Sequence, residues 1–130
     1  MILIESNPKI QINVENGVYR FDNKSGTGKS YICKILSAIT TRKDFLCLDA
    51  SNYDLVHSLK DVHKNRSLKV IILDRYDLYI NEFKEQIEDL RDEVIILIDC
   101  KHPNKLAFET GYCGIDFTED KLEVFDYDNL

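Results

Sequence analysis

Two uninterrupted apolar runs, each ending in an aspartate, constrain the fold of this chain most strongly. The first is Val70–Leu73, followed by Asp74, and the second is Val94–Ile98, followed by Asp99. Strands that are apolar at every position, rather than at alternate positions, belong to parallel sheets with both faces covered. The runs therefore predict two buried parallel strands, each with a carboxylate at its carboxyl end.

The segments around these runs alternate between strand and helix patterns. A third apolar run, Phe45–Leu48, predicts another buried strand. Apolar residues at helical spacing predict a helix over residues 31–39, one that starts with a capping box at 51–54, and one over residues 80–90. Such alternation implies right-handed βαβ units. The sequence therefore predicts an α/β fold in one domain over residues 1–130, a three-layer sandwich with a mainly parallel sheet.

Antiparallel strands are expected at both ends of this sandwich. Residues 10–14 alternate between apolar and polar, and Asn16-Gly17 is a tight-turn signal before the apolar segment Val18–Phe21. This pattern predicts an N-terminal hairpin whose second strand is Val18–Phe21. Residues 115–117 and 122–124 predict a second hairpin, with its turn at 118–121.

A glycine-rich segment follows the strand predicted at Val18–Phe21 and precedes the helix predicted at 31–39. It consists of Asn23, Lys24, Ser25, Gly26, Thr27, Gly28, Lys29 and Ser30. Gly26 and Gly28 allow a sharp turn in which successive backbone N–H groups point at an anion. The first turn of the following helix adds unpaired N–H groups and a favourable dipole for negative charge. The segment therefore predicts a phosphate-binding loop.

The segment resembles the Walker A motif of the P-loop NTPases, with Gly28, Lys29 and Ser30 matching its last three positions and Asn23 standing where the family has glycine. The resemblance implies that Lys29 binds the β- and γ-phosphates of a nucleotide and that Ser30 binds Mg²⁺. Asp74 resembles the Walker B aspartate and is the second expected Mg²⁺ ligand. The alternative is that Asp74 only terminates a strand. Because the chain has no N-K-x-D guanine signature, the expected nucleotide is ATP.

Hydrolysis is expected to be slow or absent. In the branch of this family with an extra strand between the two motifs, the AAA/RecA-like branch, a glutamate usually follows the Walker B aspartate, whereas this chain has Arg75. An arginine cannot act as a base at cellular pH. Asp77 and Asp99 are the candidate catalytic residues, and their alternatives are a helix N-cap and a strand-end aspartate. Arg75 is expected to pair with a phosphate or with Asp77.

Composition limits the class of partner and the compartment. The net charge of −6 opposes direct binding to nucleic acid and favours a basic protein partner. The chain has neither a secretory signal nor an apolar run long enough to cross a bilayer, so a cytoplasmic protein is expected. Its four cysteines form no C-x-x-C pair, and a metal shared by Cys100, His102 and Cys113 is the less favoured alternative to reduced thiols.

The last fifteen residues mix acidic and aromatic side chains. The acidic ones are Asp116, Glu119, Asp120, Glu123, Asp126 and Asp128. Such a surface can dock on a basic groove, although charge on a strand edge also prevents edge-to-edge pairing. The main hypothesis is therefore a regulatory or accessory protein that binds Mg-ATP. The alternative is a protein-binding inhibitor, of the type encoded by phages or mobile elements, that uses the fold as a scaffold. Oligomerisation is left open.

Overall fold

The two apolar runs form adjacent parallel strands in the interior of the molecule. In the computed structural model, β5 (Val70–Leu73) and β6 (Ile95–Ile98) pair in parallel, with Val70 opposite Ile95 and Leu73 opposite Ile98. Every residue of both strands is buried. The prediction of two fully buried parallel strands is confirmed.

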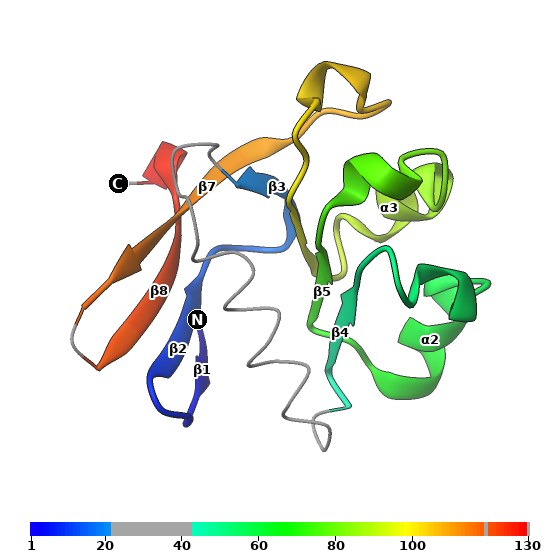
Figure 1. Ribbon diagram of the computed structural model, residues 1–130. Coiled ribbons are helices and arrows are strands. Elements are labelled where there is room, and N and C mark those ends of the chain that lie inside the picture. Colours follow the sequence, from blue (N-terminus) through cyan, green and yellow to red (C-terminus); the bar gives the residue numbers. More distant parts are fainter. Residues whose placement is uncertain (22–42, 119, 130) are drawn as a thin grey trace.

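The structure describes residues 1–21, 43–118 and 120–129, and within these ranges it contains one eight-stranded sheet (Figure 1). The order across the sheet is β1-β2-β8-β7-β3-β6-β5-β4. The remaining strands are β1 (Ile2–Ile4), β2 (Lys9–Asn13), β3 (Gly17–Phe21), β4 (Phe45–Leu48), β7 (Gly111–Phe117) and β8 (Lys121–Asp126). The segment Asn23–Ser30 and the helix predicted at 31–39 lie outside the described residues.

The sheet is mixed rather than mainly parallel throughout. β4, β5, β6, β3 and β7 run parallel to one another, whereas β7 pairs with β8, and β1 with β2, in antiparallel fashion. β2 and β8 are parallel, although they lie near opposite ends of the sequence. The α/β class and the C-terminal antiparallel pair are confirmed, the N-terminal antiparallel pair is β1 with β2 rather than the one predicted, and the mainly parallel three-layer sandwich stays a prediction.

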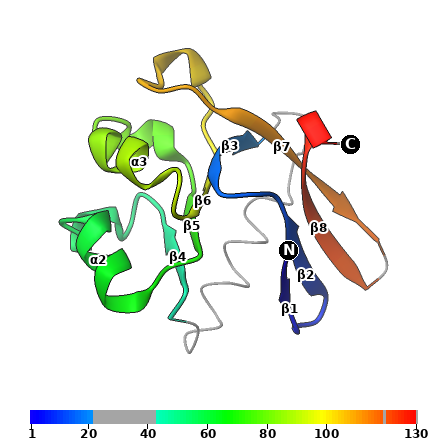
Figure 2. The same cartoon turned by 180° about the vertical axis from the view of Figure 1, so that it is seen from behind.

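The predicted N-terminal hairpin is wrong, whereas the C-terminal hairpin is right. β3 does not pair with β2 but lies between β6 and β7 (Figure 2). The physical reason is that Val18, Tyr19 and Phe21 place apolar side chains on both faces of β3, which suits the middle of a sheet and not a hairpin with a half-polar partner. At the other end, β7 and β8 pair around the predicted turn, where the Thr118 N–H donates to the Lys121 carbonyl.

The two α-helices of the described residues are shorter than the sequence pattern predicted. α2 spans Leu59–Arg66 and starts at Ser58, whose side chain accepts from the Asp61 N–H, so the capping box predicted at 51–54 is wrong. Residues 53–55 instead form a short 3₁₀ helix without a side-chain cap. α3 spans Lys84–Leu90, and a separate 3₁₀ helix covers Tyr76–Tyr79. Neither α-helix is long and apolar enough to cross a membrane.

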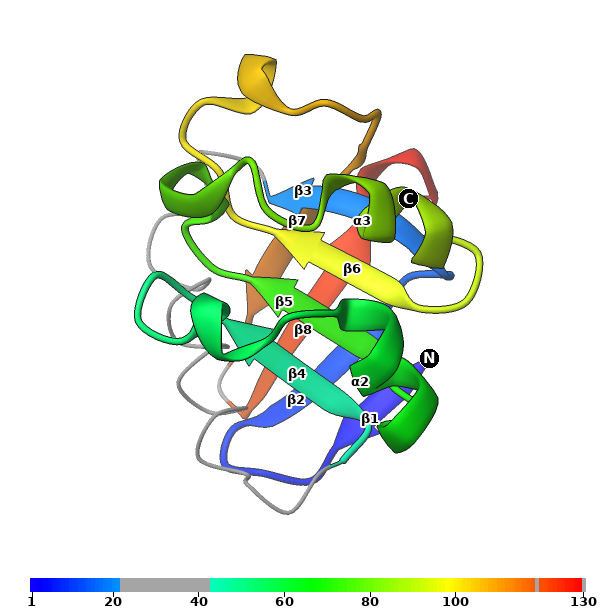
Figure 3. The same cartoon turned by 90° about the vertical axis from the view of Figure 1, so that its right-hand side faces the viewer.

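Two hydrophobic clusters cover the two faces of the central strands. α2 and α3 pack on one face, where Leu59 and Ile87 meet Ile71 and Ile96 (Figure 3). The other face is covered because the sheet curls, so that β1, β2 and β8 pack over β4, β5 and β6. The curl thus lets the polar, alternating strands cover a face that helices usually cover.

Candidate functional site

Three aspartates stand side by side at the carboxyl edge of the parallel strands. Asp49, Asp74 and Asp99 each follow the last residue of β4, β5 or β6. The strands are in register up to these ends, and backbone bonds continue past them. The Asp74 N–H donates to Leu48 at 2.8 Å, and the Asp99 N–H donates to Leu73 at 3.0 Å. Ligands of open parallel sheets bind outside this edge.

Asp74 and Asp99 form an interacting pair of carboxyl groups. The pKa of Asp74 is raised to about 6, first by burial, then by the charge of Asp99 and by a hydrogen bond that the two side chains share. Asp99 is buried, and the Oδ1 atom of Asp74 is buried without a hydrogen-bond partner. Two carboxyl groups in this setting repel when both are ionised, and a bound cation would relieve the repulsion.

Asp49 adds negative charge to this edge but is already engaged. Its Oδ1 atom accepts from the backbone N–H of Ser51 at 2.8 Å and from the Ser51 hydroxyl at 2.5 Å. The charge of Asp49 also contributes to the raised pKa of Asp74. The sequence analysis missed this residue, although the same signal, an apolar run followed by aspartate, is present at Phe45–Asp49.

A tyrosine ties the ends of two of these strands together. The hydroxyl of Tyr79 contacts the carbonyl oxygens of Leu48 at 3.0 Å and Asp74 at 2.9 Å. Its ring stacks on Tyr53, with the ring centroids 4.6 Å apart. Because both strand ends are fixed in this way, the carboxylates stand on a rigid support.

Arg75 and Asp77 interact directly at the turn that follows Asp74. Arg75 Nε lies 3.7 Å from Asp77 Oδ1, and the same oxygen accepts from the Lys101 N–H at 3.3 Å. Arg75, not Asp77, is the N-cap of the 3₁₀ helix, so the N-cap role considered for Asp77 is wrong. Asp77 joins the turn after β5 to the segment after β6, and its candidate catalytic role stays a prediction.

The predicted Walker A residues Asn23–Ser30 lie outside the described part of the chain, so their arrangement is not compared with Asp74 and Asp99. Phe21, the last described residue before them, ends β3 at the same edge of the sheet, because Arg20 is paired with Ile98 at the end of β6. The described chain therefore leaves β3 beside the carboxyl pair.

Other candidate groups lie elsewhere. A cavity of about 600 Å³, lined by Lys60, His63 and Glu93 among others, opens between α2 and α3 near the amino ends of β5 and β6. It is far along the strands from the aspartates, and the edge that parallel sheets use for ligands is the opposite one. Cys100 and Cys113 are buried in different hydrophobic clusters, which argues against a metal shared between them.

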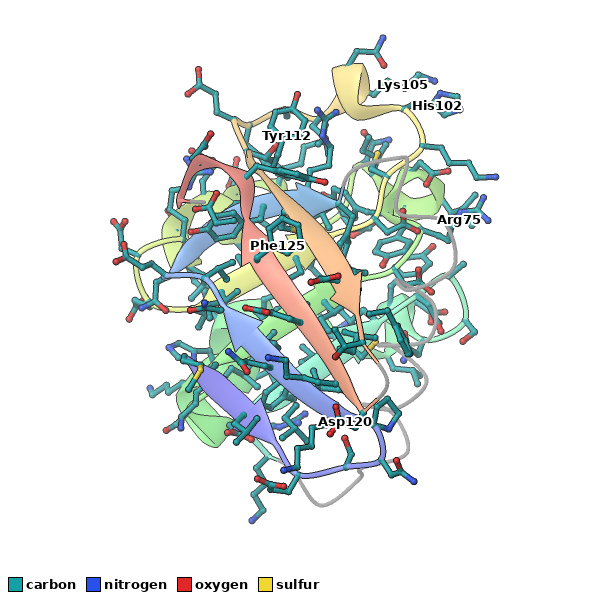
Figure 4. The ribbon with its side chains drawn as sticks, turned by 90° about the vertical axis from the view of Figure 1, so that its left-hand side faces the viewer. Arg75, His102, Lys105, Tyr112, Asp120 and Phe125 are labelled. Atoms are coloured by element: carbon teal, nitrogen blue, oxygen red, sulfur yellow. The ribbon has the colours of Figure 1, made fainter. Side chains whose placement is uncertain are left out.

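The acidic C-terminal residues lie on the other half of the sheet, which faces the viewer in Figure 4. Asp116 is directly opposite Glu123 in the β7–β8 pair. Asp126, by contrast, is buried and accepts from the Asp128 N–H. Phe125 and Tyr127 pack edge to face, with ring centroids 5.1 Å apart. Only part of the predicted acidic surface is therefore exposed, and Glu119 lies outside the described residues.

Among the described residues, no group of three histidine, cysteine, aspartate or glutamate side chains is arranged to hold a metal ion. A Mg²⁺ ion at this edge would need oxygen ligands from elsewhere, such as a hydroxyl, water or phosphate, beside the Asp74 carboxylate. The unpartnered Oδ1 of Asp74 fits that demand. Comparison of the chain with known protein families, with curated proteins and with solved structures found no match.

Proposed function

We propose that this protein binds a nucleoside triphosphate together with Mg²⁺ at the carboxyl edge of β3, β5 and β6, with ATP as the expected nucleotide. The observation that carries the proposal is the carboxyl pair of Asp74 and Asp99, which has a buried, unpartnered oxygen at the edge where β3 ends. Carboxylate oxygens are the ligands that Mg²⁺ takes from proteins when it binds with phosphates.

The strand order supports a P-loop-like arrangement. β6 lies between β3, which leads to the glycine-rich segment, and β5, which ends at Asp74. An extra strand between these two positions is the feature of the AAA/RecA-like branch that the sequence resembles. We infer that the parallel strands belong to a three-layer sandwich of that type, to which the curled antiparallel strands are added.

Different residues would bind the metal ion and the phosphates. Asp74 and the Ser30 hydroxyl would hold Mg²⁺, and Lys29 with the backbone of Asn23–Ser30 would hold the phosphates. Bound Mg²⁺ supplies charge neutralisation between the phosphate oxygens. Asp77 is engaged by Arg75 and the Lys101 N–H, which leaves it poorly suited to activate water. The proposed activity is therefore nucleotide binding with slow or absent hydrolysis, as in a regulatory or accessory protein.

Calorimetric titration tests the proposal. Mg-ATP and Mg-GTP are titrated into the parent protein and into Lys29→Ala, and phosphate release is measured in parallel. We expect Mg-ATP binding that the variant loses and little phosphate release. Absence of binding by the parent protein would refute the nucleotide proposal. Rapid phosphate release would refute the assignment of Arg75 and Asp77 as non-catalytic.

A second candidate function is capture of a basic protein through the outer face of β7 and β8. The favouring observation is that Asp116 and Glu123 are directly opposite each other, an arrangement of like charges that destabilises a strand pair and that Lys121, 3.9 Å from the Glu123 carboxylate, offsets only in part. Replacing Asp116, Asp120 and Glu123 by lysine should abolish binding to poly-lysine at low salt. A control with the same charge change at Glu88, Asp89 and Asp92, on the helix side, should retain it. If both variants lose poly-lysine binding equally, the binding depends on the net charge of the protein and not on this face, and the second candidate function is refuted.

A further inference from the structure

Arg75 has a backbone conformation that its residue type does not favour. Its φ and ψ are 50° and 47°, in the left-handed region that glycine adopts readily and that side chains with a Cβ occupy at a cost. Three non-glycine residues in the described ranges have a positive φ, and Arg75 is the one that follows the expected magnesium ligand directly. Strained backbone of this kind is found most often at functional sites, where the surrounding structure holds it in place.

The surrounding structure holds this turn in place. The Tyr76 N–H donates to the carbonyl of Asp99 at 2.8 Å, and the Leu78 N–H donates to the carbonyl of Arg75 at 3.0 Å. Asp77 adds the ion pair to the guanidinium. The turn after β5 is therefore fixed to the end of β6, and within it the guanidinium of Arg75 pairs with Asp77. Figure 4 shows the Arg75 side chain projecting outward from the body of the protein.

Arg75 and Asp74 each carry a buried polar atom without a hydrogen bond. These atoms are Nε of Arg75, a donor, and Oδ1 of Asp74, an acceptor. They belong to consecutive residues, yet they do not form a hydrogen bond with each other. The Arg75 side chain is 40% exposed, so its remaining donors are open to solvent.

The two unsatisfied atoms have opposite demands. Asp74 Oδ1 lacks a hydrogen-bond donor or cation, and Arg75 Nε lacks a hydrogen bond, although the Asp77 carboxylate lies 3.7 Å from it as an ion-pair partner. A complex of a divalent metal with a polyphosphate supplies both at once, since the metal bridges phosphate oxygens that an arginine can hold through its planar set of donors. An isolated metal ion or an isolated phosphate would satisfy one of the two atoms and repel the other.

We propose that Arg75 binds the terminal phosphate of a metal-bound nucleoside triphosphate and lets the protein distinguish the triphosphate from the diphosphate. This inference rests on the proposed function. Asp74 would hold the magnesium ion of a bound nucleotide, and Arg75, the next residue, would then be placed to bind the terminal phosphate that a diphosphate lacks. Arg75 would thus have a binding role at the position where the P-loop NTPases that the sequence resembles usually have a glutamate.

The test is substitution of Arg75 by glycine, which removes the guanidinium and the backbone strain together. Mg-ATP and Mg-ADP are titrated calorimetrically into the parent protein, Arg75→Gly and Arg75→Lys, with full-length chains in each case. We expect Arg75→Gly to weaken ATP binding by about 10- to 100-fold, as for loss of a hydrogen bond to a charged group, and to leave ADP binding unchanged. Arg75→Lys keeps the charge without the planar donors and should lie between the two.

Thermal unfolding without nucleotide gives a second, independent readout. Arg75→Gly should unfold about 3–5 °C above the parent protein, because glycine adopts the left-handed conformation without strain. Ser67→Gly is the matched control, since Ser67 has a φ of 51° at the end of α2, away from the aspartates. It should also gain stability but keep the parent's affinity for both nucleotides.

The outcomes separate this inference from the proposed function. If the parent protein binds neither nucleotide, both are refuted. If it binds both nucleotides and Arg75→Gly keeps the same ratio of affinities, only the role of Arg75 is refuted. Equal weakening of ATP and ADP binding by Arg75→Gly would also refute it, because the guanidinium would then contact a phosphate that both nucleotides share. Weaker ATP binding with unchanged ADP binding, by a variant that is more stable than its parent, supports the inference.

Discussion

Replacing Asp74 by asparagine should stabilise the protein in the absence of ligands. The amide has the shape of the carboxyl group and can donate to the Asp99 carboxylate, but it carries no charge to repel that neighbour. In the parent protein, the pKa of Asp74 is about 6 rather than 3.8. Each pKa unit corresponds to about 1.4 kcal/mol, so ionising Asp74 in the folded state costs about 3 kcal/mol. The residue is only half-buried, and screening by solvent reduces the expected gain to about 1–2 kcal/mol.

The gain in the free energy of unfolding of Asp74→Asn over the parent protein should increase as the pH rises. A carboxyl group whose pKa is raised on folding stabilises the folded state below its unfolded pKa and loses that contribution as the pH rises through its folded pKa. The variant and the parent should therefore be equally stable below about pH 4. The parent should lose stability relative to the variant as the pH rises to about 6, and the difference should be constant above about pH 7.

Urea unfolding followed by circular dichroism, at several pH values with a chelator present, measures this difference. The chain contains no tryptophan, so dichroism is a more suitable signal than tryptophan fluorescence. Asp92→Asn is the control, since it removes the same charge at an exposed position and should change the free energy of unfolding by less than about 0.5 kcal/mol. A variant that is less stable than the parent, or a difference that does not change with pH, would contradict the reasoning.

Three further predictions concern the support of this edge and are checked by urea unfolding at pH 7. Tyr79→Phe removes the hydroxyl shared by the carbonyls of Leu48 and Asp74 and should cost about 1 kcal/mol; no loss would mean that those contacts are dispensable. Leu97→Ala should cost about 2–5 kcal/mol, because Leu97 is completely buried inside the curled sheet, and a smaller loss would imply that the core collapses around the cavity. Ser58→Ala should cost about 1 kcal/mol through loss of the α2 cap, whereas Ser58→Asp should be neutral.

The fold features that the sequence predicted correctly come from patterns spread over whole strands. Continuous apolar runs predict β5 and β6, and they predict the aspartates that follow them at the carboxyl ends of these strands. The errors come from short local signals. Asn16-Gly17 favours a tight turn, but the apolar faces of β3 placed it between β6 and β7. Burial of a whole strand outweighs the preference of two turn residues.

The site was predicted in part for the same reason. Asp74 and Asp99 followed strong patterns, whereas the helix expected after Ser51 failed because Ser51 and Asn52 use their side chains on Asp49 rather than on a helix end. The left-handed backbone of Arg75 has no signal in the sequence, because it arises from the bond between the Tyr76 N–H and the Asp99 carbonyl. A hydrogen bond between two separate loops can be predicted only when the pairing and register of the strands that carry those loops are known.

The parallel pairing of β2 with β8 has a consequence for how this chain is made. Residues 9–13 bond with residues 121–125, so β2 remains without that neighbour until the ribosome has synthesised β8. The hairpin of β1 and β2 can form early, but a two-stranded hairpin is marginally stable in water. During synthesis, the edge of β2 that bonds with β8 therefore stays unpaired while β4, β5 and β6 assemble. An open strand edge is a template for pairing with another chain, so nascent chains of this protein should be prone to edge-to-edge association until β8 has been synthesised.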